Sequence, residues 1–290
     1  MSEERLHKGA LDDRNILQAL AVFRAELGEP THVNQFPYIA ATFILARLFG
    51  PNWIQSEVNG QSQSSQYFYP LDNELLHQMR IIRLAELAWN FSPYSDIDSR
   101  MLRITSGEAE SVFSELEIAE IFYKAGKLHR FVPDCDTKGL NYDLELAYGR
   151  TLVACEIKAK DEVALVGKNT IRNSLKSSLD QMPDNMPCVA VVKIPESWIR
   201  EGKLRESYQG AFAEVFRNNS KLSAAILRYE CVIQEPDGPL TVFGYYIQHN
   251  QKANLSLMVY GDLVKQLPIE PPWKSIAKVV SVQHGLMTKI

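Results

Sequence analysis

The sequence of 290 residues lacks the local motifs that identify several large classes of enzyme and binding protein. It has no Gly-rich phosphate loop, no G-x-S-x-G elbow and no zinc-finger spacing. Its six histidines show no metal-ligand spacing either. These absences argue against P-loop nucleotide hydrolysis, serine hydrolase chemistry, finger-type DNA reading and a histidine-based zinc site.

Cysteines and long apolar segments are also scarce. The four cysteines are far apart and form no C-x-x-C pair, which predicts reduced thiols rather than disulfides. The longest apolar run, 38–50, is interrupted by Arg47 and is too short to cross a bilayer. The first residues, MSEERLHKG, are charged and do not resemble a signal sequence. We therefore expect a soluble cytoplasmic protein without a membrane partner.

The net charge is small but unevenly distributed. A formal net charge of -4 argues against a protein that coats nucleic acid, while 46% hydrophobic residues suffice for a packed core. Residues 1–120 hold 9 Lys and Arg against 17 Asp and Glu, whereas residues 156–228 hold 12 against 9. A polyanionic partner is therefore expected to meet the second half of the chain.

The first third of the chain is predicted to be mainly α-helical. Apolar residues recur at helical spacing in three segments, 11–28, 37–49 and 71–89. A polar stretch at 60–66 (GQSQSSQ) is typical of a flexible loop. Because residues 1–105 contain no chemical motif, we interpret them as a helical accessory region.

The remainder, 106–290, is predicted to alternate between helices and strands. In chain order the elements are a helix at 108–125, a strand at 128–133, a hairpin at 141–160, a helix at 167–182, a strand at 187–194, a helix at 203–218, and strands at 222–233 and 240–248. The order α-β-β-β-α-β, followed by a C-terminal α-β-β extension, favours a three-layer α/β (α+β) core with a mixed central sheet.

The stretch 141–160 (NYDLELAYGRTLVACEIKAK) is the most informative part of this region. A two-residue turn at Gly149 and Arg150 puts glycine at the first central position, which type II′ turns prefer. Counting back along both strands from this turn sets Asp143 opposite Glu156.

Side chains alternate across a strand, so the hairpin is expected to have one polar and one apolar face. The polar face would hold Asn141, Asp143, Glu145, Glu156 and Lys158. The apolar face would hold Tyr142, Leu144, Leu146, Val153, Cys155 and Ile157. The polar face is either a site or simply solvated, because a hairpin with one wet face shows the same alternation.

Residues 108–195 resemble the PD-(D/E)XK nuclease superfamily, whose restriction-endonuclease-like core has the order α-β-β-β-α-β. The matching text is SELEIAEIFYKAG in the helix, NYDLEL in the second strand and CEIKAK in the third. The resemblance implies four catalytic positions, which are Glu115, Asp143, Glu156 and Lys158.

Two of these positions have neighbours that compete for the same role. Asp134, in a Pro-Asp pair, also fits the loose spacing of the superfamily, but it falls in a polar turn and Asp143 is preferred. On the helix, Glu115 lies eleven residues before the glycine that follows it, an interval common in the superfamily, and Glu117 is kept as a fallback.

The resemblance also implies a divalent cation, Mg²⁺, for which Mn²⁺ can substitute. Its ligands would be Asp143, Glu156, the backbone carbonyl of Ile157 and Glu115. Such ions neutralise the attacked phosphate, generate hydroxide and stabilise the leaving oxyanion. Lys158 would either deprotonate the attacking water or stabilise charge in the transition state, and the sequence leaves both roles open. The expected activity is phosphodiester hydrolysis, on DNA rather than RNA.

Further residues are weaker candidates. The stripe Lys168, Arg172 and Lys176 could contact phosphates, although a basic helix face is more often just solvated. Gln181 resembles an auxiliary polar residue of the superfamily. A homodimer would suit cleavage of both strands of a duplex. The rival function is a catalytically inactive module that binds nucleic acid or a protein partner.

Overall fold

The computed structural model describes residues 13–28, 35–58, 74–135, 137, 139–160, 164–200, 204–235, 238–253, 255, 259–264 and 272–283. The chain divides into two compact units, Met1–Phe113 with Glu270–Ile290, and Ser114–Ile269. This division falls near the expected boundary at 105, but the last segment groups with the N-terminal helices instead of extending the sheet domain. The expected loop at 60–66 lies outside the described residues.

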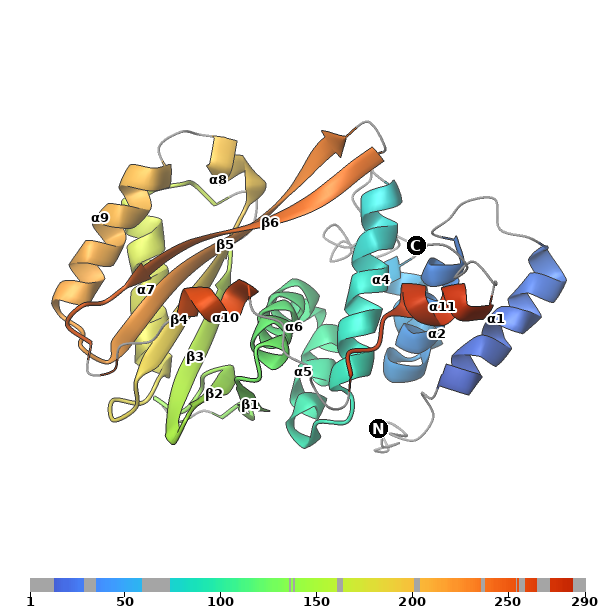
Figure 1. Ribbon diagram of the computed structural model, residues 1–290, viewed down its shortest axis with the longest axis horizontal. Helices are drawn as coiled ribbons and strands as arrows, with labels where there is room; N and C mark the ends of the chain where they lie inside the picture. Colours follow the sequence, from blue (N-terminus) through green and yellow to red (C-terminus); the bar gives the residue numbers. More distant parts are fainter. Residues whose placement is uncertain are drawn as a thin grey trace. The chain divides into compact units, whose positions relative to one another are not determined.

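The first unit is helical, as predicted, and its helices are visible in Figure 1. They are α1 (Asp13–Leu27), α2 (Gln35–Phe49), α3 (Pro51–Trp53), α4 (Glu74–Phe91), α5 (Asp98–Arg103) and α11 (Ile276–Gln283). Its core is aliphatic and aromatic, and includes Ile16, Leu20, Ala41, Ile44, Leu84, Leu87 and Phe91. None of the helices in the described ranges is long and apolar enough to cross a membrane.

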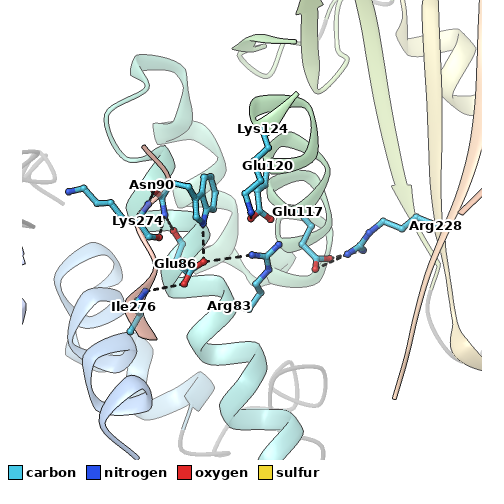
Figure 2. Close-up of polar contacts among 10 residues, drawn as sticks. Arg83, Glu86, Asn90, Glu117, Glu120, Lys124, Arg228, Lys274 and Ile276 are labelled. Atoms are coloured by element: carbon cyan, nitrogen blue, oxygen red, sulfur yellow. Dashed lines mark hydrogen bonds and ion pairs between the residues drawn. The ribbon is translucent and has the colours of Figure 1, made fainter. Parts of the chain in front are cut away.

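Hydrogen bonds to α4 explain why the C-terminal segment belongs to this unit (Figure 2). The two carboxylate oxygens of Glu86 accept from Trp273 Nε1 at 2.9 Å and from the backbone N–H of Ile276 at 3.1 Å. Asn90 donates to the carbonyl of Lys274 and accepts from its N–H, both at 2.8 Å. The segment is therefore held mainly through backbone groups, which its composition does not reveal.

The second unit contains a six-stranded mixed sheet in the order β1-β2-β3-β4-β5-β6. The strands are β1 (Leu128–Phe131), β2 (Leu144–Tyr148), β3 (Thr151–Ala159), β4 (Cys188–Ile194), β5 (Leu222–Glu235) and β6 (Gly238–His249). The pairs β3–β4 and β4–β5 are parallel, and the other three are antiparallel. The helices are α6 (Ala109–Lys124), which begins in the first unit, α7 (Lys168–Gln181), α8 (Glu196–Arg200), α9 (Leu204–Arg217) and α10 (Val259–Val264).

Helices cover both faces of the sheet, which confirms the predicted three-layer α/β architecture (Figure 1). Helices α7 and α9 pack against Ala190 and Leu227 in one apolar cluster. Helix α6 reaches the opposite face, because Glu117 contacts Lys193 and Arg228, whose side chains alternate with those of that cluster. The order α6-β1-β2-β3-α7-β4 is the one predicted from the sequence.

The central hairpin has the predicted register. Tyr148 pairs with Thr151 and Leu144 with Cys155, without a shift between them. Gly149 has a φ of +65°, and within the described ranges positive φ occurs only at glycines. A positive φ at Gly149 followed by a negative φ at Arg150 is the combination that a type II′ turn requires.

Candidate active site

The first candidate residue, Asp143, immediately precedes β2 and faces β3. Its backbone N–H donates to the carbonyl of Cys155 at 3.2 Å. Its side chain turns toward the same strand, where Oδ2 accepts the backbone N–H of Ile157 at 2.7 Å. The paired register ends at Leu144 and Cys155, and because the Asp143 N–H bonds to that same Cys155 carbonyl, the expected pairing of Asp143 with Glu156 is not part of the regular ladder. Because the N–H and C=O of a strand residue point to the same side, the carbonyl of Ile157 also points toward β2.

Burial decides between the two readings of the polar hairpin face. Asp143 is 9% exposed, Glu145 4% and Glu156 2%. A solvated face would leave these carboxylates in water, so that alternative is wrong. Buried carboxylates require partners, since transferring an unpaired charge from water is costly.

Glu145 meets this requirement through an internal ion pair. It accepts two hydrogen bonds from Arg130, at 2.9 and 2.8 Å, and one from the Tyr142 hydroxyl at 2.8 Å. The bonds from Arg130 are the main reason why the pKa of Glu145 is lowered. Tyr142 therefore does not lie on the apolar face as expected: it packs in the cluster under α7, because the regular alternation begins only at Leu144.

Lys158 lies between Glu156 and Gln181 and contacts both. Its Nζ lies 2.7 Å from Glu156 Oε1 and also donates to Gln181 Oε1 at the end of α7. The second oxygen of Glu156, Oε2, is buried and has no hydrogen-bond partner among the described residues. Glu156 and Lys158 on β3 and Gln181 on α7, named from the sequence at separate places, are thus linked through the Lys158 ammonium group, and Asp143 bonds to the backbone N–H of Ile157, between Glu156 and Lys158.

The environment perturbs the acid–base behaviour of Glu156. Burial raises its pKa to about 7, although the neighbouring Lys158 ammonium lowers it and the Glu115 charge raises it further. A carboxylate with a pKa near neutrality and a cation at 2.7 Å is typical of functional sites.

Glu156→Gln is expected to remove a pH dependence from the stability of the protein. The pKa of Glu156 is about 7 in the folded protein against 4.5 as the ordinary value, so the protonated carboxyl stabilises the fold below about pH 4.5. That stabilisation is lost as the pH rises through about 7, over a span on the order of 3 kcal/mol.

The free energy of unfolding of this variant, measured by urea titration in EDTA, should therefore rise relative to the wild type between about pH 5 and about pH 8. A difference between the two proteins that stays constant across this range would contradict the assignment.

Three acidic residues of α6 have different environments. Glu115 is 2% exposed and its charge acts on Glu156. Glu117 instead forms a bidentate pair with Arg228, at 2.8 and 2.9 Å. Glu120 pairs with Lys124 at 2.6 Å. Glu115 is therefore the acid of this helix whose charge acts on Glu156, whereas Glu117, the fallback, is paired with Arg228 of the sheet. Asp134, the alternative to Asp143, is exposed in its loop.

The donor set suits a hard divalent cation in part. Asp143 Oδ2 lies 2.7 Å from the backbone nitrogen of Ile157, the residue next to Glu156, and Glu156 Oε2 has no hydrogen-bond partner among the described residues. However, within the described ranges no group of three or more His, Cys, Asp and Glu side chains stands close enough to hold a metal ion together. A Mg²⁺ ion would thus be held by two carboxylates, one carbonyl and water, which is common for this ion.

The basic stripe on α7 is partly neutralised. Glu214 on α9 pairs with Lys168 at 3.0 Å and with Arg172 at 3.1 Å, while Lys176 is exposed. Hydrogen bonding from Lys168 is the main cause of the lowered pKa of Glu214. The sequence did not indicate Glu214, because it lies 42 residues from Arg172 and no local pattern connects them.

Comparison with known protein families, with curated proteins and with solved structures found no match for this chain.

Proposed function

We propose that the protein is a metal-dependent nuclease of the PD-(D/E)XK type that hydrolyses phosphodiester bonds in DNA rather than RNA. The observation that carries the proposal is the convergence of Asp143, Glu156 and Lys158. These residues are the acid, acid and lysine of the motif, and both acids are buried. The observed order of helices and strands supports the same superfamily.

Mg²⁺, or Mn²⁺ in its place, supplies Lewis-acid activation of the phosphate and of water when bound. Asp143, Glu156 and the Ile157 carbonyl would hold the ion. The raised pKa of Glu156 means that cation binding competes with a proton on this carboxyl, so affinity for the ion should increase with pH. Glu115 adds negative charge beside the site, which favours a cation there.

Lys158 is placed to deprotonate the attacking water or to stabilise the negative charge that develops in the transition state. Its ammonium group is oriented by Glu156 on one side and Gln181 on the other. Its side chain is 27% exposed, so the group is within reach of a bound substrate. A donor held in this way needs little reorganisation during the reaction.

Nucleic acid as the partner is supported by the acid–acid–lysine set and by the basic residues that follow it on α7. Lys168, Arg172 and Lys176 would supply contacts to phosphates, which are independent of sequence. Glu214 reduces the charge that Lys168 and Arg172 present, so we assign this helix a secondary contribution. Cleavage of both strands of a duplex would favour a homodimer.

Two observations favour the rival function, an inactive module that binds nucleic acid or protein. Lys158 occupies Glu156 Oε1, and the described acids do not form a three-residue metal cluster. Calorimetric titration with Mn²⁺ separates the two functions. The nuclease is expected to bind Mn²⁺ in a manner that Asp143→Ala abolishes, whereas the inactive module would show no such binding.

The activity is tested by incubating the protein with plasmid and with single-stranded DNA in Mg²⁺ or Mn²⁺. Asp143→Ala is expected to lower cleavage by at least about 10²-fold, since it removes a ligand of the ion. EDTA should abolish cleavage by the wild type. Cleavage that persists in EDTA or in the variant would overturn the proposed function.

A further inference from the structure

Lys221, the residue before β5, joins the sheet to the end of α7. Its backbone carbonyl accepts the N–H of Cys188 at the start of β4, at 2.8 Å. Its Nζ donates to the carbonyls of Leu179 and Met182, both at 3.0 Å, and to Asp184 Oδ1 at 2.7 Å. The last carbonyls of a helix have no partner within it, and a lysine can satisfy them.

The two carbonyls held by Lys221 flank Gln181, the residue that accepts from Lys158. The backbone leaves the helix here, since Met182 is extended with φ -96° and ψ 147°. The last turn of α7 would therefore be free to fray without an external anchor. Its position relative to the parallel strands depends on Lys221, whose side chain is only 15% exposed.

The ion pair between Lys221 and Asp184 does not account for this arrangement. Asp184 is fully exposed, at 100%, and pairs of this kind contribute little in water. The two carbonyl contacts are the ones that fix the helix end. They hold the backbone on both sides of Gln181, and with it the side chain that orients the Lys158 ammonium group.

We propose that Lys221 is a positioning residue for Lys158 and acts through Gln181. This inference rests on the proposed function, in which Lys158 takes part in phosphodiester hydrolysis. A lysine that only capped the helix would affect stability, whereas a positioning residue also affects the cleavage step, and only while Gln181 is present.

The test is a double-mutant cycle with Lys221→Met, Gln181→Ala and the double variant, in single-turnover cleavage with saturating protein and Mg²⁺. Lys221→Met is expected to lower the rate about tenfold in the wild-type background and to have no effect when Gln181 is already alanine. Lys221→Arg, which keeps donors at the helix end, should restore most of the rate. Lys252→Met, a substitution at an exposed lysine after β6, is the control.

An equal loss of rate in both backgrounds, or no loss in either, would overturn the inference.

A second measurement does not need activity. The side-chain amide resonances of Gln181 in an NMR spectrum should shift on Lys158→Met, and Lys221→Met should abolish that response. If the wild type fails to cleave DNA but this response is seen, the proposed function fails while the positional link stands. If cleavage occurs and the response persists in Lys221→Met, the inference alone fails.

Discussion

Lys158→Met is expected to lower the rate of Mg²⁺-dependent DNA cleavage by about 10³-fold while leaving DNA affinity nearly unchanged. The substitution keeps most of the volume of the side chain and removes the ammonium group that lies 2.7 Å from Glu156 Oε1. A group that acts mainly in the transition state contributes to the cleavage step and little to ground-state binding. Single-turnover cleavage and anisotropy titration of a short duplex separate the two quantities.

Lys160→Met is the matched control, because Lys160 lies two residues further along the chain and follows β3. Its backbone N–H bonds to the carbonyl of Lys193, an interaction that the substitution preserves. This variant should cleave at close to the wild-type rate. Equal rates for Lys158→Met and the wild type would refute a role for Lys158 in the cleavage step and favour the inactive module.

Glu117→Gln is expected to destabilise the protein by about 3–5 kcal/mol, the range found when one partner of a buried ion pair is removed. Glu117 lies between two cations, with Arg228 at 2.8 and 2.9 Å and Lys193 at 3.4 Å (Figure 2 shows the Arg228 pair). Burial by itself would lower the pKa of Arg228, but the charge of Glu117 outweighs it and the pKa is raised. In the variant, Arg228 and Lys193 stay buried but lose the negative charge that Glu117 supplies.

Arg228→Met is expected to destabilise the protein less than Glu117→Gln does. Arg228→Met leaves Glu117 paired with Lys193, one anion with one cation, and should therefore cost less than Glu117→Gln. Arg228 also lies 4.9 Å from the ring centre of Phe243, so its loss removes packing as well as charge. Urea unfolding followed by circular dichroism measures both free energies of unfolding. The opposite ranking would show that packing, rather than charge balance, dominates at this position.

Two glutamates of helix α6 act on different parts of the second unit. Glu115 acts electrostatically on Glu156, and Glu117, two residues later, anchors α6 to β4 and β5. A substitution at Glu117 is therefore expected to affect the site indirectly, by shifting α6 and with it the position of Glu115. Activity lost in Glu117→Gln should be compared at a temperature where the variant is folded, because partial unfolding alone would lower the measured rate.

Much of the fold around the site follows from short-range patterns. The alternation of apolar and polar residues and the glycine at Gly149 predict both the hairpin and its register, since strand pairing next to a two-residue turn is set locally. The three-layer class follows from the order of elements, because parallel strands joined through helices need cover on both faces. Short helices such as α8 and α10 were not predicted, since a single turn shows no periodicity.

The site itself depends on information that is not local. The sequence by itself determined the turn at Gly149 and the register of the strand pair from Leu144–Cys155 to Tyr148–Thr151. Only the tertiary structure decided that the acidic side chains of the hairpin are buried, that Gln181 on helix α7 accepts from Lys158 on strand β3, and that Glu117 pairs with Arg228, 111 residues away. The physical reason is that burial and ion pairing depend on which elements pack together, and a pattern along the chain describes one element at a time.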